Sequence, residues 1–200
     1  MAAGAFEKVS TPKRRQTAQV LIVTGLPAAG KTTLAMLLAR RWSVPLLYKD
    51  LIKKALLDVL GATDASASRR LSDASFAVLF ALARELVAAG ASLVLEGNFR
   101  PAEHASPARA LSRTAKCAQV LCLSEEPERI RRLRARASDA NRHAGHRDAE
   151  QAKSASRPAG YLNFPGERFL FTGTEAPEWP QLLERLDRWW IAAGARARAR

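Results

Sequence analysis

Short apolar runs alternate with longer stretches of helical periodicity along most of the chain. The short runs are rich in Val, Leu, Ile and Phe, which predicts buried β-strands, and the longer stretches repeat their apolar residues as amphipathic helices do. This alternation indicates a parallel α/β sheet that binds ligands at the carboxyl ends of its strands. The predicted strands are residues 20–23, 45–48, 92–96, 118–123 and 168–172, and the predicted helices are residues 34–42, 50–60, 72–89, 103–115, 127–137 and 180–193.

The remaining segments lack apolar periodicity. Residues 62–70 are polar and rich in Ser and Ala, so we expect a mobile loop there, and residues 139–160 are also expected to form a loop. A chain of 200 residues suits one domain of ordinary size. We place this domain at residues 18–193, between a flexible basic N-terminus, residues 1–17, and a basic tail, residues 194–200.

Residues 25–32 are Gly-Leu-Pro-Ala-Ala-Gly-Lys-Thr, a full match to the phosphate-binding P-loop pattern. Gly25 and Gly30 permit a tight turn whose backbone N–H groups surround phosphate. Lys31 would reach the β- and γ-phosphates, and the Thr32 hydroxyl would bind Mg²⁺. The alternative, a glycine-rich turn before an ordinary helix, is disfavoured by the strand–loop–helix order. We therefore expect an ATP site formed by Gly25, Leu26, Pro27, Ala28, Ala29, Gly30, Lys31, Thr32 and Thr33.

Asp50 follows the second predicted strand, where a side chain would point into the crevice above the sheet. A carboxylate there could accept the proton of a substrate hydroxyl. The alternative is a helix N-cap, since Asp is favoured at that position, and the two roles can coexist. Lys53 lies one turn later and could bind the acceptor or a phosphate, although a solvated surface position is commoner for lysine.

Glu96 ends the third predicted strand, within Leu-Val-Leu-Glu-Gly-Asn-Phe-Arg-Pro. An acidic residue at the end of an apolar strand beside the P-loop strand is suited to hold Mg²⁺ or its waters. Gly97 would let the chain turn close to a ligand, and Asn98 and Arg100 could contact the acceptor. We therefore expect Thr32 and Glu96 at the metal and Asn98 and Arg100 at the substrate.

The net charge of +13 is concentrated in three segments. Residues 1–15 carry +3, residues 127–147 carry +5 and residues 194–200 carry +3. Frayed, solvated ends are the ordinary interpretation of the two terminal segments. The rest of the chain is nearly neutral, so the charge alone is weak evidence for a nucleic-acid partner.

The internal basic segment has a different interpretation, as a lid of about residues 127–160. Arg132 and Arg136 are four residues apart, hence on one face of the predicted helix. Guanidinium groups match phosphate oxygens, so these two arginines could neutralise charge that develops during phosphoryl transfer. A solvated helix face is the alternative. Arginines with little acidic balance repel one another unless an anion is present, which favours the lid.

Other candidate features have simpler interpretations. His143 and His146 with Asp148 are a weak metal signal, and we assign them structural or lid contacts. The tryptophans at 179, 189 and 190 recur with leucines at helical spacing, which favours packing over base stacking. Cys117 and Cys122 lie five positions apart on one predicted strand and should face opposite sides. They cannot readily pair, and no run is apolar enough to span a bilayer, so we expect a cytoplasmic protein.

Four segments together resemble a known group: the P-loop, Tyr48-Lys-Asp-Leu-Ile-Lys-Lys-Ala-Leu56, Glu96-Gly-Asn-Phe-Arg100 and Arg142-His-Ala-Gly-His-Arg-Asp148. They resemble the predicted small kinases of the P-loop kinase-like family, labelled AAA_33 or zeta-toxin-like. Polynucleotide kinase and chloramphenicol phosphotransferase are better-known relatives. The resemblance implies a P-loop NTPase three-layer sandwich, with a five-stranded parallel sheet in the order 2-3-1-4-5 and an arginine-rich lid.

The resemblance also implies residue roles. Asp50 takes the position of the general base, Lys53 that of a basic residue in polynucleotide kinase, and Arg132 with Arg136 that of lid arginines. Adenylate-kinase-type enzymes carry Asp-Gly-Phe-Pro-Arg where this chain has Glu96-Gly-Asn-Phe-Arg, so a nucleotide acceptor is not supported. We expect an ATP- and Mg²⁺-dependent phosphotransferase acting on a small-molecule hydroxyl. The alternatives are a 5′-hydroxyl polynucleotide kinase and a nucleotide-gated binding protein. Neither the acceptor nor the oligomeric state can be inferred from the sequence.

Overall fold

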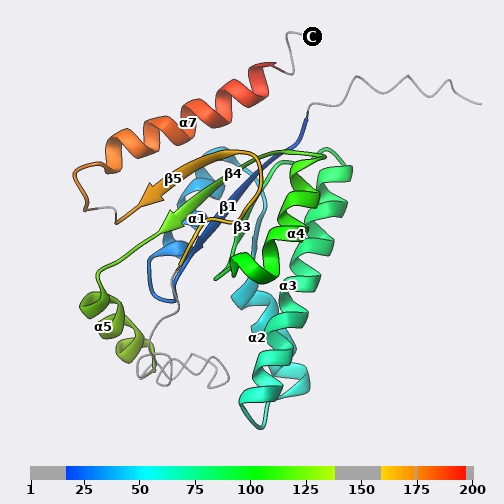
Figure 1. Ribbon diagram of the computed structural model, residues 1–200, viewed down its shortest axis with the longest axis vertical. Helices are drawn as coiled ribbons and strands as arrows, with labels where there is room; N and C mark the ends of the chain where they lie inside the picture. The colour runs from blue at the N-terminus through cyan, green and yellow to red at the C-terminus, as the bar shows by residue number, and fades with distance from the viewer. Residues whose placement is uncertain (1–16, 138–158, 174, 197–200) are drawn as a thin grey trace, which may run out of the picture.

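The protein folds into a parallel sheet covered by helices on both faces, in a computed structural model that describes residues 17–137, 159–173 and 175–196 (Figure 1). The sheet has five strands in the order β2-β3-β1-β4-β5, and all neighbouring strands are parallel. This confirms the predicted fold class and strand order. The strands are β1 (Gln19–Gly25), β2 (Leu46–Tyr48), β3 (Leu93–Glu96), β4 (Lys116–Cys122) and β5 (Glu167–Phe171).

The helices follow the strands in the alternating order expected of this class. Most of their bounds lie within a few residues of the predicted ones. They are α1 (Lys31–Trp42), α2 (Lys49–Leu60), α3 (Ala65–Ala88), α4 (Pro101–Ser112), α5 (Glu126–Ala137) and α7 (Trp179–Arg196). Within the described residues, no helix combines the length and the apolar character needed to cross a membrane.

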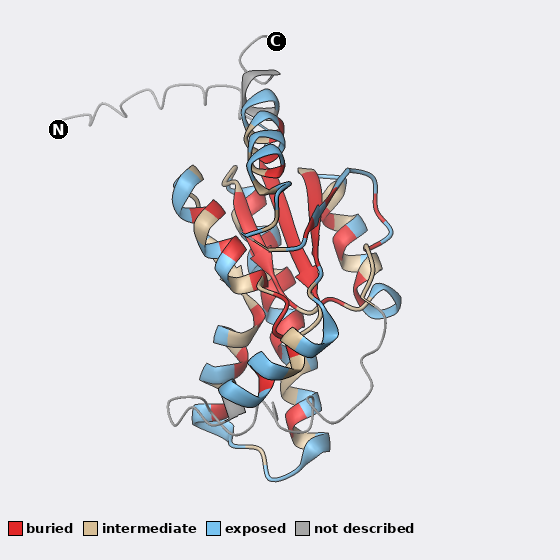
Figure 2. Ribbon diagram, turned by 90° about the vertical axis from the view of Figure 1, so that its left-hand side faces the viewer, coloured by how far each residue is buried: buried red, intermediate tan, exposed pale blue. Residues whose placement is uncertain are grey.

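The central strand β1 divides the core into two layers, which surround the buried strands in Figure 2. Val20 and Ile22 pack with residues of α3 and α4, whereas Leu21 and Val23 pack with residues of α1 and α7. All seven residues of β1 are buried, because alternate side chains enter the two layers. The P-loop follows this strand, so the loop starts from the most enclosed part of the sheet.

Helix α7 packs against α1 through aromatic and polar contacts. The rings of Trp42 and Trp190 are stacked, with centroids 4.2 Å apart. Asp187 accepts hydrogen bonds from the Arg41 guanidinium at 2.7 Å and from the Trp42 indole at 2.9 Å. Trp189 is buried in the same layer. In α7 the tryptophans therefore have the packing role that their spacing predicts.

Cys117 and Cys122 face opposite sides of β4, as predicted. Cys117 lies in the layer with α3 and α4, and Cys122 in the layer with α1 and α7. Both are free, and burial raises the pKa of each thiol to about 12. Both thiols are therefore protonated near neutral pH, which makes them poor nucleophiles.

The prediction of a loop over residues 62–70 is wrong, because α3 begins at Ala65. Asp64 caps this helix, and its carboxylate accepts a hydrogen bond from the Ala67 N–H at 2.7 Å. The first turns of α3 are largely exposed, and only Ser68 is buried there, so their sequence shows no helical repeat of apolar residues. The alanines in these turns favour a helix even where no apolar face is present.

Candidate active site

The P-loop depends on glycines at both ends. Gly25 has a φ of 140°, and a Cβ added there would collide with the backbone carbonyl of Cys122 on β4. Gly30 has a φ of 84° and precedes the first residue of α1. Ala28, between them, also has a positive φ, of 64°. The loop thus adopts a backbone that ordinary side chains disfavour, and its two glycines reduce that cost.

The N-terminus of α1 has the electrostatics of an anion site. Its first turn contains no acidic residue, and Gly30 offers no side chain to cap the backbone N–H groups. The buried Lys31 donates a hydrogen bond to the Leu26 carbonyl at 2.8 Å, which holds its ammonium group against the loop. Backbone N–H groups, the helix dipole and one ammonium group are the elements that bind a polyphosphate.

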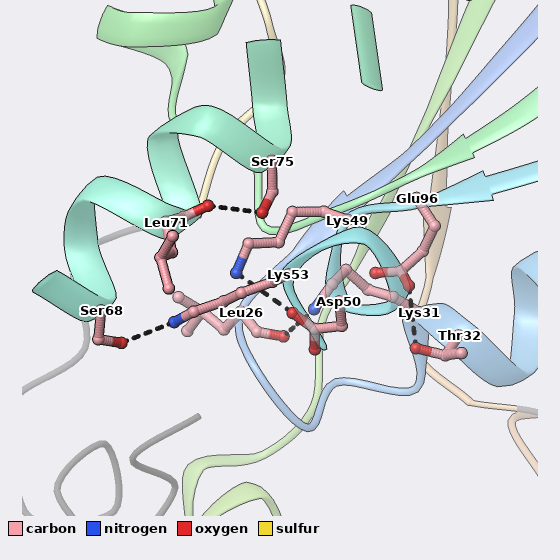
Figure 3. Close-up of polar contacts among 10 residues, drawn as sticks. All are labelled: Leu26, Lys31, Thr32, Lys49, Asp50, Lys53, Ser68, Leu71, Ser75 and Glu96. Carbon is pink, nitrogen blue, oxygen red and sulfur yellow. Dashed lines mark hydrogen bonds and ion pairs between the residues drawn. The ribbon is translucent and has the colours of Figure 1, made fainter. Parts of the chain in front are cut away.

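Glu96 lies between the P-loop and the start of α2. Along the sheet it is opposite Val23 of β1 on one side and Tyr48 of β2 on the other. The Thr32 hydroxyl donates a hydrogen bond to its carboxylate at 3.0 Å (Figure 3). The structure therefore brings together the two residues that the sequence predicted at the metal.

Burial raises the pKa of Glu96, a residue that is only 4% exposed. The ammonium group of Lys31 is the strongest opposing influence, and the Asp50 carboxylate adds to the increase. The Thr32 hydrogen bond and Lys49 lower the pKa to a smaller extent. The influence of Asp50 on the pKa of Glu96 indicates that the two carboxylates belong to one electrostatic site.

The oxygen pair of Thr32 and Glu96 suits Mg²⁺, which prefers hard oxygen ligands. Among the residues that the structure describes, no group of three or more His, Cys, Asp or Glu side chains could hold a metal by itself. A magnesium ion at this position would therefore depend on phosphate oxygens and water for its other ligands, as Mg²⁺ commonly does.

Asp50 occupies the second position of α2, just after β2. Its carboxylate forms an ion pair with the Lys49 ammonium group at 3.2 Å, and its side chain is 46% exposed. Tyr48 is the residue that precedes the helix, and its side chain makes no capping hydrogen bond. Asp50 is thus not the N-cap, so the alternative interpretation of this residue is wrong.

Lys53 is buried and contacts α3. Its ammonium group donates a hydrogen bond to the Ser68 hydroxyl at 2.8 Å. Lys49, one turn earlier, is also buried, and its ammonium group lies 5.9 Å from the centre of the Phe76 ring. Neither Lys49 nor Ser68 was predicted from the sequence to lie at the site. Asp64, which starts the helix that encloses both lysines, was the available local signal.

The two residues predicted after β3 occupy different settings. Asn98 is half-buried in the loop between β3 and α4. Arg100 forms ion pairs with Asp73 of α3 at 3.0 Å and with Glu103 of α4 at 2.7 Å. The positive charge of Arg100 is therefore offset by two carboxylates.

Helix α5 places one predicted lid arginine beside the P-loop. Arg132 donates a hydrogen bond to the Ala28 carbonyl at 3.4 Å and another to Glu128 at 2.6 Å. Glu128 also pairs with Arg131, and the hydrogen bonds of the two guanidinium groups lower its pKa to about 2. Glu128 thus offsets part of the positive charge of these arginines, which weakens the repulsion argument that favoured the lid. The Arg136 side chain, Arg142 and the His143–His146 segment lie outside the described residues.

Comparison with known proteins agrees with this architecture. The sequence profile of an AAA domain, AAA_33, matches residues 20–158. A Chloroflexus aurantiacus protein provisionally assigned as a kinase superposes with a TM-score of 0.76 at 29% identity, covering 86% of this chain and 98% of that one. No curated protein sequence matches.

More distant structures share the fold. The APS kinase of Mycobacterium tuberculosis, solved with AMPPNP and APS, has a TM-score of 0.55 at 20% identity over 86% of this chain and 96% of its own. A chain of the Pnkp1/Rnl/Hen1 RNA repair complex has a TM-score of 0.51 at 15% identity over 74% of this chain and 47% of its own. By its matched profile and its sheet order, this chain belongs to the AAA_33 family and has the P-loop kinase-like fold.

Proposed function

We propose that the protein is an ATP- and Mg²⁺-dependent phosphotransferase whose acceptor is a hydroxyl group of a small molecule. The observation that carries this proposal is the position of Asp50 and of the Thr32–Glu96 pair around Lys31 at one end of the sheet. A half-exposed carboxylate beside a phosphate-binding loop is suited to activate the acceptor hydroxyl of a kinase. The provisional assignment of the Chloroflexus protein and the APS kinase fold support the same reaction class.

The roles follow from the chemistry of each group. The P-loop N–H groups and Lys31 bind the triphosphate, and Thr32 with Glu96 hold Mg²⁺, which neutralises phosphate charge when bound. Asp50 accepts the proton of the acceptor hydroxyl while the hydroxyl oxygen forms a bond to the γ-phosphorus of ATP. The bond between the γ-phosphorus and the oxygen that bridges it to the β-phosphate breaks, and ADP leaves with that electron pair.

Arg132 supplies positive charge near the P-loop, since its guanidinium group contacts the Ala28 carbonyl. We assign it, with Arg136, to a lid of about residues 127–160 that neutralises charge on the transferred group. Removal of one such charge typically lowers the rate about a hundredfold or more.

Replacement of Asp50 by Asn tests the proposal. A general base commonly contributes a factor of about 10² to 10⁴, so Asp50→Asn should lose turnover on that scale while its affinity for ATP·Mg²⁺ stays within about twofold. Asp58→Asn is the matched control, because Asp58 lies on the same helix and pairs at the surface with Lys54. ATP binding is measured by calorimetry.

Turnover is measured as ATP consumption over aminoglycosides, chloramphenicol-like antibiotics, sugars, nucleosides and 5′-hydroxyl oligonucleotides. Unchanged turnover in the Asp50→Asn variant would remove Asp50 from the mechanism. Binding of ATP with no stimulation of its consumption by any hydroxyl compound would favour a nucleotide-gated binding protein.

A further inference from the structure

His104 is a buried histidine of α4 that has no role in the mechanism above. It is 6% exposed, and its ring lies among those of three phenylalanines: Phe76 and Phe80 of α3, and Phe99 between β3 and α4. The ring centroids of His104 and Phe76 are 4.0 Å apart, and the Phe99 ring is nearly perpendicular to the imidazole at 5.8 Å. The histidine therefore connects α3 and α4 with the β3–α4 segment, residues 97–100, which leaves the sheet directly after Glu96.

The imidazole accepts a hydrogen bond from the backbone of this segment. The Arg100 N–H donates to His104 Nδ1 at 2.8 Å. Because a backbone amide can only donate, Nδ1 carries no proton, and the neutral ring holds its proton at Nε2. Arg100 directly precedes α4 and offers that helix no side-chain cap. His104 thus fixes the point at which the β3–α4 segment enters the helix.

Asn98 lies between two anchored residues of the β3–α4 segment. Before it, the Gly97 N–H donates to the Val23 carbonyl of β1 at 3.2 Å. After it, the buried Phe99 ring packs against α3, and the hydrogen bond to His104 follows one residue later. Asn98 is itself half-buried, two positions after the carboxylate of the metal site. The placement of its side chain therefore depends on the anchors on both sides.

Protonation of the imidazole would remove the second anchor, because Nδ1 would then carry a proton opposite the Arg100 N–H. The charged groups around the ring are Arg100 of the segment, Glu103 of α4 and, on α3, Asp73 with Arg69, which pairs with Glu103. Burial lowers the pKa of His104 and the Arg100 charge lowers it further, whereas Glu103 and Asp73 raise it. The ring is therefore neutral near pH 7. The hydrogen bond is lost as pH falls from about 6.5 through the lowered pKa.

We propose that His104 is a positioning residue, which as a neutral imidazole holds Asn98 toward the acceptor and on protonation releases it. This rests on the proposed function, in which the acceptor hydroxyl lies at Asp50. The Asn98 amide can both donate to and accept from a molecule that carries hydroxyl groups. A segment that is already fixed binds such a molecule without the ordering cost of a loose one. Acid should therefore weaken acceptor binding through His104 and leave ATP binding unchanged.

The first test follows the hydrogen bond itself and needs no acceptor. The full chain is saturated with AMPPNP·Mg²⁺, and the titration of His104 is read from its ring signals by proton NMR. Hydrogen exchange of residues 97–104 is measured by mass spectrometry and corrected for the intrinsic effect of pH. Protection of the Arg100 amide should fall about fivefold or more as pH drops through the His104 midpoint. Residues 105–112 of α4 are the internal control and should keep their protection. Protection that persists, or that is lost at a different pH, overturns the inference.

Two substitutions separate the ring from its acceptor nitrogen. His104→Phe keeps an aromatic ring among the phenylalanines but cannot accept the hydrogen bond, so protection of the Arg100 amide should fall about fivefold even at pH 8. His104→Asn loses the ring but keeps an oxygen near the place of Nδ1, so it should restore most of the protection and remove its pH dependence. The melting temperature checks that each variant folds. Equal protection in the wild type and His104→Phe overturns the inference, and the wild-type titration decides the matter if neither variant folds.

The second test measures acceptor binding in the ATP-consumption assay, with the alcohol that is consumed fastest. At pH 8, His104→Phe should raise the KM for that alcohol about threefold or more, with a smaller change in kcat and none in the KM for ATP. As pH falls, the KM of the wild type for the alcohol should rise relative to that of His104→Asn. An unchanged KM despite lost amide protection would show that His104 serves stability alone, which overturns the inference and leaves the kinase proposal intact. ATP binding without turnover of any alcohol would instead contradict the kinase proposal, and the acceptor role of His104 with it.

Discussion

Replacement of Glu96 by Gln should make the protein more stable and much less active. Glu96 is 4% exposed, and the influences that raise its pKa, burial first and then Asp50, outweigh those of Lys31, Thr32 and Lys49. The folded protein therefore disfavours the ionised carboxylate on balance. Gln has nearly the same shape, carries no charge and keeps an oxygen that can accept the Thr32 hydrogen bond.

The sign of the pH dependence follows from the raised pKa. The folded state binds the Glu96 proton more tightly than the unfolded chain does, so the unfolding free energy falls as pH rises from about 4.5 through the raised pKa and is level above it. Each factor of ten in that protonation equilibrium corresponds to about 1.4 kcal/mol. Gln does not titrate, so the unfolding free energy of the variant does not fall with pH through this position. At pH 8 we therefore expect the Gln variant to have a higher unfolding free energy than the wild type.

The catalytic effect has the opposite sign because it depends on the charge. If Glu96 holds Mg²⁺ beside the phosphates, the amide leaves that ion with one negative ligand fewer. Turnover should fall about a hundredfold or more, and the Mg²⁺ concentration for half-maximal rate should rise. ATP affinity without Mg²⁺ should change little.

Urea unfolding at several pH values between 4 and 8, with turnover measured against Mg²⁺ concentration, provides the test. Glu85→Gln, at an exposed position of α3, is the matched control and should change neither quantity. A Glu96→Gln variant that is less stable than the wild type at pH 8, or one whose advantage does not grow with pH, would refute the electrostatic argument. Full activity would refute the metal role.

Three substitutions test the architecture by urea unfolding. Gly25→Ala should lower the unfolding free energy by about 1–3 kcal/mol, because its φ is 140° and a Cβ there meets a carbonyl of β4; a neutral effect would contradict that geometry. Trp190→Ala should cost about 2–3 kcal/mol through its lost stacking on Trp42, and a loss below about 1 kcal/mol would show that α7 is held elsewhere. Hydrogen bonding to Arg41 lowers the pKa of Asp187, so the stability contributed by this carboxylate is present above its unfolded pKa and is lost as pH falls through the folded one. Asp187→Asn should therefore lower the unfolding free energy by less than about 1 kcal/mol at pH 7, since Arg41 is half-exposed, and should not change it at the lowest pH. An equal loss at both pH values would show that the effect does not come from the ion pair.

The strand–helix alternation could be predicted because parallel strands buried on both faces are continuous apolar runs. Val20 to Val23 illustrate this, since alternate residues enter two different core layers. The order of the strands came from the resemblance to a family, because local periodicity contains no information on which strands are neighbours. The start of α3 was missed because an exposed, alanine-rich turn needs no apolar face.

The candidate site was predictable where its residues are contiguous or end a strand. The P-loop is a local motif, and Glu96 stands out as a carboxylate that follows an apolar strand. Lys53 was a candidate from the sequence, but its burial, like that of Lys49, was not predictable in this way. Their enclosure depends on α3, and the hydrogen bond from Lys53 joins it to a residue 15 positions away. Burial of this kind is set by how two helices pack, which a single stretch of sequence does not encode.

Partners, more than residue type, decide which cation near the site can serve a substrate. In the sequence, Arg100 and Lys53 are comparable candidates for an acceptor group. In the structure, two carboxylates surround Arg100, whereas Lys53 is buried against the hydroxyl of Ser68. A substrate anion at Arg100 would have to compete with both carboxylates. Arg100 is therefore a weaker candidate for binding the acceptor than its position in the sequence alone indicates.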